Sequence, residues 1–564
     1  MTSPQHRIDE FTRSGWWSDT QLHQMLARQA AANPAMLAVA DPPNRPALTG
    51  EDPSRLTYAE LEQLTLYLSI QLQEAGLVRG DTVLLQLPNT VELVAVYFAA
   101  SRLGLILSPV PMQYRQHELK VAQKTLGPQA MITLERFHET EHAAQARNCL
   151  DPDVQVLAFG ASLPEGCRML SANGANHSPT PEQLANLKAG DDLGSANDLL
   201  TVCWTSGTTG EPKGVPRSHN MWLATARNSS AAGEYQPGDR LLNPFPLVNM
   251  AGIGGFLFPF VDVGCSLYLH HPFDPGVFLQ QMAQEKITFT IVPPAVLNQL
   301  AGSPETWNAF DFTELRRIGS GSAPLAPWMV DTFDNTYGKQ IVNFYGSNEG
   351  IALFSTPETS PDPKVRATMF PRMGVDGMPW TGITHEMVGT RVVAVDTEID
   401  ITEPGEPGEL LFYGPTVFDG YTNNLGDDVF TSDGWFRTGD LVEICPEATD
   451  YYRIVGRCKD IINRGGMKIS PAELDILLEA FPGIREGAVC SYPDENLGER
   501  VCACIVPQEL QHVPTLEKIC AFLTQQGLAR FKLPERLLLL DALPRNPMGK
   551  VQRNLLEKAV AADE

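Results

Sequence analysis

Strand-like and helix-like segments alternate through the first half of this 564-residue chain, and this alternation strongly limits its fold. Residues 82–87 (TVLLQL) and 105–111 (LILSPVP) are strand candidates, and the apolar segment from about 91 to 103 between them is a helix candidate. A strand, a helix and a strand in succession favour parallel βαβ units. Similar strand and helix pairs recur at residues 154–159, 199–204 and 287–300. The sequence therefore predicts an α/β fold built from βαβ-type subdomains.

One of the early helices carries clear start and stop signals. Thr57 and Glu60 have the spacing of a capping box, in which each side chain bonds the backbone N–H group of the other residue. Gly76 offers a stop. Leucines repeat at helical spacing between them, at positions 61, 64, 68 and 72. These signals predict a helix that begins near Thr57 and ends near Gly76.

The pattern changes after about Pro371, where short β-like runs broken by Gly and Pro begin. They predict a smaller β-rich subdomain at about residues 371–459. The remaining chain has the length of a small domain, and the segment from Ser470 to Glu473 has the pattern of a helix start. We therefore expect a large N-terminal domain over residues 1–459 and a small, mobile α+β domain over residues 460–564.

The charge balance excludes one class of function. The chain has 42 Lys and Arg residues against 67 Asp and Glu residues, which gives a formal charge of −25 with neutral histidines. Dedicated nucleic-acid binders show a basic face and a high pI, so we expect no nucleic-acid partner.

Neither an export signal nor a membrane span is expected. The N-terminus is polar. The most apolar segment, residues 250–261, is closed by Asp262 and is shorter than the roughly 18 residues that cross a bilayer, so it is predicted to be a buried element. The ten cysteines include no C-x-x-C pair and no zinc-finger spacing. We therefore expect reduced thiols and a cytoplasmic location.

The most informative segment is residues 205–214 (TSGTTGEPKG), directly after an apolar strand candidate. Its glycines let the backbone approach a ligand, its hydroxyls can donate to phosphate oxygens, and Lys213 adds a positive charge. It is not a Walker A loop, because Pro212 precedes the lysine where that motif needs Gly, and no Ser or Thr follows the lysine. The composition indicates a phosphate-binding loop, with a solvated Gly/Ser/Thr loop as the alternative.

Together with its companion segments, this loop resembles the signature motif of the adenylate-forming superfamily, which comprises acyl-CoA synthetases, aryl-acid and amino-acid adenylation domains, and luciferases. The companion motifs follow in that family's order, at 321–325 (GSAPL), 345–350 (YGSNEG), 408–421 (GELLFYGPTVFDGY), 434–441 (GWFRTGDL), 452–475 (YRIVGRCKDIINRGGMKISPAELD) and 543–553 (LPRNPMGKVQR). Seven motifs in this order make a chance origin negligible. The resemblance implies that ATP activates a carboxylic acid to an acyl-AMP with release of pyrophosphate, and that the acyl group then passes to a thiol.

The resemblance also implies roles for individual residues. The loop ending at Lys213 would hold the β- and γ-phosphates of ATP, Tyr345 would stack on the adenine, and Glu349 would hold Mg²⁺, a hard cation suited to carboxylate and phosphate oxygens. Asp440 would accept the ribose hydroxyls with Arg457 beside them, and a surface ion pair is the alternative for these two. The cofactor-binding set for ATP and coenzyme A is Thr205, Ser206, Gly207, Thr208, Thr209, Gly210, Ser322, Ala323, Pro324, Tyr345, Gly346, Asn348, Asp440, Ile454, Arg457, Gly465 and Gly466.

Lys550 is expected to be the main catalytic residue, together with Lys213 and Glu349. Negative charge accumulates on the phosphoryl oxygens when a carboxylate attacks the α-phosphate, and a positioned ammonium group stabilises that charge. In this family the C-terminal domain rotates between two half-reactions, and Asp460 falls at the hinge position. The second orientation would bring the glycine pair 465–466 to the site and leave a tunnel for the pantetheine thiol of CoA.

Two positions depart from the family's pattern. Asn249 stands where a histidine commonly gates the acyl group, and Asn348 stands where Thr usually precedes the acidic residue. The surrounding segments are apolar and glycine-rich, which suits an aryl, cyclic or medium-chain acid. No carboxylate lies in residues 245–252 to hold a substrate ammonium, so an α-amino acid is disfavoured. The residues expected to line the acyl pocket are Asn249, Met250, Gly252, Gly321 and Ile351.

Three functions remain open at this point. The first is an acid:CoA ligase, because residues 462–475 (INRGGMKISPAELD) resemble CoA ligases and aryl-acid activating enzymes more than amino-acid modules. The second is a stand-alone adenylation enzyme that loads the phosphopantetheine of a carrier protein. The third is a catalytically silent relative that binds or regulates. The partners expected are a small-molecule carboxylic acid and either CoA or a carrier protein; the oligomeric state is open, with a homodimer as one option.

Overall fold

The computed structural model describes residues 3–172, 180–191, 193–205, 212–422, 429–465, 467–494, 496–509, 513–545 and 551–563, without the side chains of residues 188–191 and 468. The chain divides into two compact units. One comprises residues 1–389 and 412–436, and the other comprises residues 390–411 and 437–564. The domain boundary expected at residue 460 stays a prediction.

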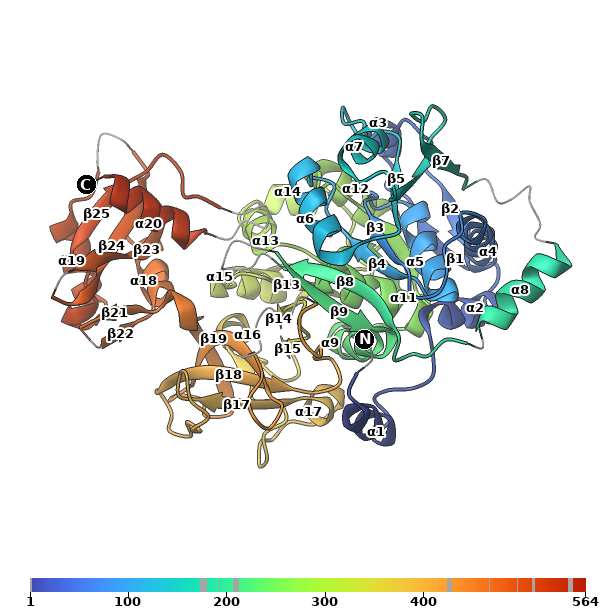
Figure 1. Cartoon of the computed structure of the whole chain (residues 1–564). Helices are drawn as coiled ribbons and strands as arrows, with labels where there is room; N and C mark the ends of the chain where they lie inside the picture. Colours follow the sequence, from blue (N-terminus) through green and yellow to red (C-terminus); the bar gives the residue numbers. More distant parts are fainter. Residues whose placement is uncertain are drawn as a thin grey trace. The chain divides into compact units, whose positions relative to one another are not determined.

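The first unit contains two largely parallel sheets (Figure 1). The strands of one sheet are β3 (Thr82–Leu85), β4 (Ile106–Pro109), β5 (Ala130–Leu134), β6 (Gln155–Phe159), β7 (Cys167–Leu170), β8 (Leu199–Thr205) and β9 (Lys213–Ser218). Their order is β7-β6-β5-β3-β4-β8-β9, and only β8 and β9 pair antiparallel. The predicted βαβ arrangement is therefore confirmed, but β8 leads into a hairpin before the next helix.

The helices that accompany this sheet follow the signals in the sequence. They are α4 (Tyr58–Glu74), α5 (Val91–Leu103), α6 (Gln116–Leu126), α7 (His142–Cys149), α8 (Pro181–Asp191) and α9 (His219–Gly233). The predicted capping box of α4 forms, because Thr57 Oγ1 accepts from Glu60 N at 3.3 Å and Glu60 Oε2 accepts from Thr57 N at 2.8 Å. Every residue of α5 is buried, as expected of a helix that is apolar on nearly all sides.

The second sheet has eight strands. They are β1 (Leu37–Ala40), β2 (Arg55–Thr57), β10 (Arg240–Asn243), β11 (Ser266–Leu269), β12 (Phe289–Ile291), β13 (Arg317–Gly321), β14 (Gln340–Gly346) and β15 (Ala352–Ser355). Their order is β15-β14-β13-β12-β10-β11-β1-β2, with antiparallel pairing only at the two ends. A parallel sheet of this kind places all its central carboxyl ends at one edge, where ligands bind in open α/β folds.

The remaining elements of the first unit are short. They are α1 (Gln5–Arg13), α2 (Leu22–Ala32), α3 (Arg45–Thr49), α10 (Met250–Gly252), a π-helical turn (Ile253–Leu257), α11 (Phe258–Val263), α12 (Pro275–Gln284), α13 (Pro294–Ala301), α14 (Pro304–Asn308), α15 (Pro327–Asp331), a second π-helical turn (Thr332–Thr336), α16 (Pro363–Thr368), β16 (Phe370–Pro371) and α17 (Ile383–Met387). The apolar segment 250–261 is helical and largely buried, as predicted.

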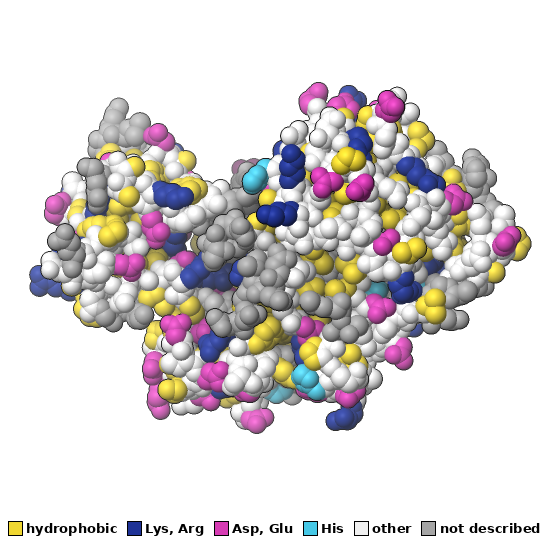
Figure 2. Space-filling model, in the orientation of Figure 1, with side chains coloured by type: hydrophobic (Ala, Val, Ile, Leu, Met, Phe, Trp, Pro, Cys, Tyr) yellow, Lys and Arg dark blue, Asp and Glu magenta, His cyan; other side chains and the backbone are white. Residues whose placement is uncertain are grey.

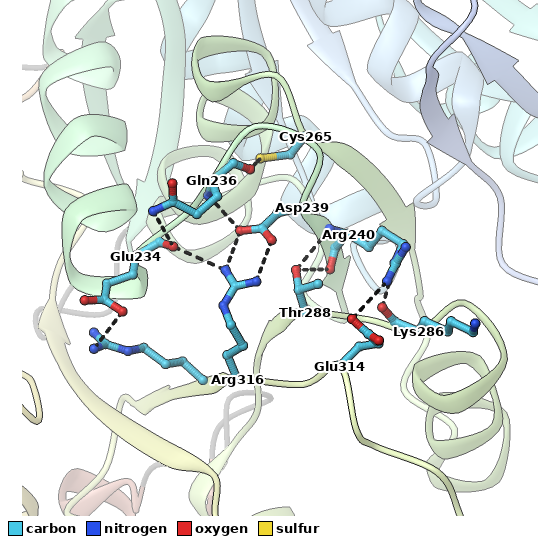
Figure 3. Close-up of polar contacts among 10 residues, drawn as sticks. Glu234, Gln236, Asp239, Arg240, Cys265, Lys286, Thr288, Glu314 and Arg316 are labelled. Carbon is cyan, nitrogen blue, oxygen red and sulfur yellow. Dashed lines mark hydrogen bonds and ion pairs between the residues drawn. The ribbon is translucent and has the colours of Figure 1, made fainter.

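Polar contacts tie together the amino ends of three parallel strands, as Figure 3 shows. Arg316, just before β13, holds both carboxylate oxygens of Asp239 at 2.8 and 2.7 Å and donates to the carbonyl of Glu234 at 3.3 Å. The backbone N–H of Arg240, the first residue of β10, donates to Thr288 Oγ1 at 3.0 Å, just before β12. The polar groups drawn at this end of the sheet therefore bond to one another, and the predicted functional residues that follow β10, β13 and β14 lie at the opposite, carboxyl ends of those strands.

The second unit begins with a β-rich part and continues into an α+β part. Its strands are β17 (Gly389–Val393), β18 (Pro407–Tyr413), β19 (Phe436–Ile444), β20 (Tyr451–Arg457), β21 (Ile462–Arg464), β22 (Met467–Ile469), β23 (Ile484–Asp494), β24 (Gly498–Pro507) and β25 (Arg536–Leu539). Its helices are a 3₁₀ turn (Cys458–Asp460), α18 (Pro471–Glu479), α19 (Leu516–Gln525), a second 3₁₀ turn (Arg530–Lys532) and α20 (Arg553–Ala562). The order β20-β19-β18-β17 forms one sheet, and β22-β21-β24-β23 forms another with β25 beside β24.

Ser470 occupies the predicted N-cap position of α18, but its hydroxyl donates to the carbonyl of Val455 instead of capping the helix. On the face shown in Figure 2, the Lys and Arg side chains of the described residues lie scattered among Asp and Glu. In the described ranges, no helix combines the length and the apolar character that crossing a bilayer requires.

Candidate nucleotide and acyl site

The predicted loop lies between two antiparallel strands of the first unit. Thr205 ends β8, Lys213 begins β9, and the two residues face each other across the hairpin. Both are partly exposed. The predicted loop residues Ser206, Gly207, Thr208, Thr209 and Gly210 lie outside the described residues.

Lys213 and Glu349 both contact the side chain of Tyr421, the lysine at the ring and the glutamate at the hydroxyl. The ammonium nitrogen of Lys213 lies 4.8 Å from the ring centroid of Tyr421, within cation–π distance. The hydroxyl of Tyr421 donates to Oε1 of Glu349 at 2.8 Å. The structure therefore brings a cation and a carboxylate that lie 136 positions apart in the sequence to the side chain of Tyr421.

Asn348 joins the two sheets of the first unit. Its side-chain oxygen accepts from the backbone N–H of Met250 at 2.8 Å, and its side-chain nitrogen donates to the carbonyl of Trp204 at 3.1 Å. Trp204 precedes Thr205 at the end of β8, whereas Met250 begins α10 at the predicted acyl pocket. The residue that departs from the family's threonine thus links the phosphate loop to the acyl segment.

A buried guanidinium group holds the backbone of the same segment. Arg217 donates to the carbonyl of Asn348 at 2.8 Å and to the carbonyl of Met221 at 3.0 Å, and its carbon Cζ lies 4.2 Å from the ring centroid of Trp222. Burial lowers the pKa of Arg217 to about 9, while the negative charge of Glu349 acts in the opposite direction. Arg217 is therefore still charged at neutral pH, next to the residue predicted to hold Mg²⁺.

Asn249 uses its side chain to cap α10. Its side-chain oxygen accepts from the backbone N–H groups of Ala251 at 3.1 Å and Gly252 at 3.3 Å. Asparagine is a preferred N-cap residue because its oxygen satisfies donors that the first helical turn leaves open. The position that commonly carries a gating histidine is thus part of the local helix start in this protein.

Several predicted pocket residues contact backbone. A methyl group added at Gly321 would overlap the carbonyl oxygen of Phe344 on the neighbouring strand, and one added at Gly252 would lie 2.5 Å from the carbonyl oxygen of Pro246. Ile351 is buried, and its carbonyl accepts from Ser347 N at 3.2 Å. These glycines therefore allow close approach of backbone at the rim of the predicted pocket; their contact with substrate stays a prediction.

The predicted adenine segment is exposed. Ser322, Ala323 and Pro324 follow β13 directly, and Ser322 has a φ of 70°, in the left-handed region. Tyr345 is partly exposed near the carboxyl end of β14, beside Gly346, and its ring centroid lies 5.5 Å from that of Phe370. An exposed turn and a half-exposed aromatic ring at the ends of adjacent parallel strands form a surface on which a flat base can stack.

The predicted ribose residues lie on neighbouring strands of the second unit. Asp440 on β19 pairs in register with Arg457 on β20, and Arg457 Nε lies 2.8 Å from Asp440 Oδ1. The Asp440 side chain is 10% exposed and that of Arg457 is 42% exposed. The ion pair that we gave as the alternative for these residues is therefore present. Ile454, also predicted to contact the cofactor, is exposed on β20.

The remaining predictions concern the C-terminal part. Asp460 ends a 3₁₀ turn, and its Oδ2 lies 3.5 Å from Arg553 Nε. Gly465 has a φ of 59°, which only glycine adopts readily. Gly466 and Lys550 lie outside the described residues, so their predicted roles have no structural test here.

Two residues that contact the site, Tyr421 and Arg217, went unassigned in the sequence, as did Arg7, which holds the segment that carries Tyr421. Tyr421 is the last residue of the motif at 408–421, but nothing in the motif shows which group its hydroxyl bonds. Arg7 stands in the polar segment QHRIDE and Arg217 in the mixed segment VPRSHN, so nothing in the sequence marks either arginine as buried. Their partners are backbone carbonyls from distant segments, and the sequence alone cannot locate those carbonyls.

Two largely parallel sheets that bring a lysine and a carboxylate to one tyrosine have the fold and the charged groups of phosphate-handling α/β enzymes. Residues 36–422 match the family model of the AMP-binding enzymes, and residues 473–550 match that of the AMP-binding enzyme C-terminal domain. The chain therefore belongs to the AMP-binding enzyme family, as its motifs indicated.

Relatives match over nearly the whole chain. Pyochelin synthase PchD of Pseudomonas aeruginosa (strain UCBPP-PA14) is 30% identical over 98% of this chain and 94% of its own length. Indoleacetate–CoA ligase of Aromatoleum aromaticum is 30% identical over 96% of this chain and 98% of its own length. The crystal structure of ATP-bound MatB from Rhodopseudomonas palustris matches with a TM-score of 0.74 and 26% identity, covering 96% of this chain and 99% of that chain. The predicted fold class is confirmed.

Proposed function

We propose that this protein uses ATP to activate a carboxylic acid to an acyl-AMP and then transfers the acyl group to CoA. The observation that carries the proposal is the arrangement of Lys213, Tyr421 and Glu349 at the start of β9. A cation and a carboxylate at one tyrosine match the two needs of a nucleoside triphosphate, since its phosphates attract Lys213 and its Mg²⁺ attracts Glu349.

The residues present fit Mg²⁺ as well as ATP. Mg²⁺ is usually bound by one or two carboxylates together with substrate phosphates, and Glu349 supplies one carboxylate whose Oε1 is already oriented by Tyr421. When bound, Mg²⁺ neutralises charge on the phosphate oxygens. Lys213, at the ring of Tyr421, binds the same phosphates, and Arg217 holds the backbone that carries Glu349.

The proposed chemistry proceeds in two steps. A substrate carboxylate oxygen attacks the α-phosphorus, the bond from that phosphorus to the bridging oxygen breaks, and pyrophosphate leaves. The thiol sulfur then attacks the acyl carbonyl, AMP leaves, and the thiol proton passes to solvent. Lys550 stabilises the charge that develops in the first step. Asp440 accepts hydrogen bonds from the ribose hydroxyls, with Arg457 holding its carboxylate in place.

The substrate that we propose is an apolar acid, either aryl, cyclic or medium-chain. Met250 and Phe344 are partly exposed and offer apolar surface beside the end of β14, and the π-helical turn that follows α10 is buried in the adjoining core. π-Helical turns are common at functional sites because they interrupt the regular helix surface. The indoleacetate–CoA ligase relative supports both an aryl acid and CoA.

A carrier protein as the thiol acceptor is the second candidate. Pyochelin synthase PchD, which is 30% identical to this chain as the indoleacetate–CoA ligase is, is named as a synthase and not as a CoA ligase, and this supports an acceptor other than CoA. Both candidates share the first step and differ only in the thiol.

One experiment tests the activation and a second tests the acceptor. Pyrophosphate release is measured with Mg²⁺-ATP and a panel of aryl, cyclic and medium-chain acids, with α-amino acids as negative controls. We expect release that depends on an apolar acid. The acid that responds is then supplied with CoA and, separately, with a holo-carrier protein. Acyl transfer to CoA supports the ligase, transfer only to the carrier supports the second candidate, and no acid-dependent release favours a catalytically silent relative.

A further inference from the structure

Tyr421 contacts both charged residues of the candidate phosphate site with different parts of its side chain. Its ring faces the ammonium group of Lys213 at 4.8 Å, and its hydroxyl donates to Glu349 Oε1 at 2.8 Å. A χ1 rotation that moved the ring away from the lysine would also move the hydroxyl from the carboxylate. Tyr421 therefore sets the separation and the direction of two groups that approach each other from β9 and from the end of β14.

The segment that carries Tyr421, residues 414–422, is bonded to the backbone on both sides of the site. Phe418 N donates to the carbonyl of Glu349 at 2.9 Å, and Thr416 Oγ1 donates to the carbonyl of Gly350 at 2.7 Å. At its end, Thr422 N donates to the carbonyl of Gly214 at 3.0 Å, next to Lys213. We call residues 414–422 the strap. The strap thus joins the backbone beside the lysine to the backbone of the carboxylate.

The N-terminal helix α1 holds the strap through one buried arginine. The guanidinium of Arg7 donates to the carbonyls of Gly414 at 3.0 Å, Val417 at 2.9 Å and Phe418 at 3.2 Å, and it forms an ion pair with Asp419. Arg7 is only 8% exposed. Hydrogen bonds from a charged donor are stronger than neutral ones, and buried carbonyls that lose their donor carry a desolvation cost.

Trp17 adds a second contact from the N-terminal segment. Its indole Nε1 donates to the carbonyl of Pro415 at 3.1 Å, and Cζ of Arg7 lies 6.0 Å from its ring centroid. Arg7 and Trp17 therefore donate hydrogen bonds to four carbonyl groups of the strap. These carbonyls belong to Gly414, Pro415, Val417 and Phe418. Nothing in the proposed chemistry requires this, because neither side chain reaches the candidate site itself.

We propose that Tyr421 is a positioning residue that fixes Lys213 and Glu349 relative to each other, and that α1 keeps Tyr421 in place by holding the strap through Arg7. This inference rests on the proposed function, since it takes Lys213 and Glu349 as the residues that receive Mg²⁺-ATP. It predicts that Arg7 in α1 affects the gain in ATP affinity that Mg²⁺ provides.

The test measures ATP binding by isothermal titration calorimetry, with Mg²⁺ and with EDTA, on the full chain. Tyr421→Phe keeps the ring over Lys213 and removes the hydroxyl from Glu349, so we expect the gain in affinity due to Mg²⁺ to fall about tenfold with little change in EDTA. Tyr421→Leu also removes the ring, so we expect affinity in EDTA to fall as well. Tyr337→Phe, which removes a hydroxyl bonded to Leu300 O away from the site, is the matched control and keeps both affinities.

The role of α1 is tested in the same assay. Arg7→Met lowers the gain from Mg²⁺ as Tyr421→Phe does, Arg7→Lys restores part of it, and Arg13→Met at the exposed end of α1 leaves it unchanged. Melting curves of each variant identify any loss of fold. If Arg7→Met does not fold, Arg7→Lys is compared with the wild type alone, and its gain in affinity from Mg²⁺ should be smaller than that of the wild type.

The outcomes separate this inference from the proposed function. An unchanged gain from Mg²⁺ in folded Tyr421→Phe overturns the inference, even when the protein activates acids as proposed. A wild-type protein that binds Mg²⁺-ATP but releases no pyrophosphate with any acid overturns the proposed function, while the binding measurements still judge Tyr421 and Arg7. A wild-type protein that binds no Mg²⁺-ATP overturns both.

Discussion

Asn348 shows how one residue can serve two neighbouring parts of a site. Its amide group accepts from Met250 N and donates to Trp204 O, at 2.8 and 3.1 Å. An asparagine amide has both a donor and an acceptor at the end of a rigid plane, whereas a threonine offers one hydroxyl on a shorter stem. The asparagine at this position therefore links Trp204, next to the predicted phosphate loop, to Met250 in the predicted acyl segment.

We predict that Asn348→Ala lowers the activity of the enzyme with both ATP and the acid, because it removes the hydrogen bond to Trp204 O and the hydrogen bond from Met250 N. The expected loss in kcat/KM is about tenfold for ATP and for the acid, from about 1–2 kcal/mol of hydrogen bonding. Initial rates of pyrophosphate release at varied ATP and varied acid measure it. Asn348→Thr, which keeps one polar group, is expected to fall between the variant and the wild type. If kcat/KM of Asn348→Ala stays within twofold of the wild-type value for both ATP and the acid, the two hydrogen bonds of Asn348 do not support the reaction.

His219 links the stability of the fold to pH. It begins α9, it is buried, and its Nδ1 accepts from Leu22 N at 3.3 Å. Burial lowers the pKa of His219 to about 3, and the positive charges of His23 and Arg79 act in the same direction. The ordinary pKa of histidine is about 6.5. Between these two values the unfolded chain binds a proton that the folded chain does not, so stability falls as the pH falls from 6.5 towards 3.

We predict that His219→Asn makes stability less dependent on pH in this window. Asparagine retains an acceptor near the position of Nδ1 and does not titrate. Between pH 7 and pH 5 the variant should lose about 2 kcal/mol less of its unfolding free energy than the wild type. Urea unfolding at both pH values measures the difference. His6→Asn on the exposed face of α1 serves as the control and should keep the wild-type slope; equal slopes for all three proteins would argue against a neutral His219.

At the scale of elements, the loop after β14 and the strap are packed backbone against backbone. Gly350 has a φ of 114°, and a methyl group added to it would overlap the carbonyl of Thr416. Only glycine permits both the backbone conformation and the close approach. The loop that carries Glu349 therefore depends on a strap that comes from another part of the chain.

We predict that Gly350→Ala destabilises the protein by more than about 3 kcal/mol, because the conformational strain and the overlap add. Thermal melting measures this loss. Gly420→Ala in the strap is the control, since Gly420 has a φ of 122° and no described atom lies within 4 Å of an added methyl group. The control should lose only about 1–2 kcal/mol from the strained φ. Equal losses in the two variants would mean that the contact with Thr416 contributes nothing.

At the scale of the whole molecule, the residues of the proposed reaction come from both compact units. Lys213 and Glu349 belong to the first unit, and Asp440 and Arg457 belong to the second. The motif with Lys550 also belongs to the second unit in sequence. In the proposed mechanism, the mobile C-terminal domain predicted at residues 460–564 carries Lys550 and supplies it to the first half-reaction only.

We predict that Lys550→Ala abolishes acyl-AMP formation but largely spares thioester formation from a supplied acyl-AMP, because the lysine acts only in the first half-reaction. The first step should slow by at least 10²–10³-fold. Acid-dependent pyrophosphate release measures the first step, and thioester formation from a synthetic acyl-AMP measures the second. Lys558→Ala in α20 serves as a control for loss of a nearby positive charge. An equal loss in both half-reactions would contradict the two-orientation account.

The sequence alone predicts much of the fold. The capping box at Thr57, the apolar helix from Val91 to Leu103 and the alternation of strands and helices all depend on neighbours in the chain, and the structure confirms them. A prediction from local signals is wrong where a tertiary contact takes the same side chain. Ser470 has the pattern of a capping residue, yet its hydroxyl bonds the carbonyl of Val455.

The sequence by itself determined the α/β class, the family and the positions of the charged residues, because these depend on local periodicity and on motifs that keep their spacing. Only the tertiary structure decided that Tyr421 contacts both Lys213 and Glu349, and that Arg7 holds the strap that bears it. These contacts join residues separated by 72 to more than 400 positions, and their partners are often backbone carbonyls. Every residue has such a carbonyl, so no sequence pattern marks the ones that folding brings to a buried arginine.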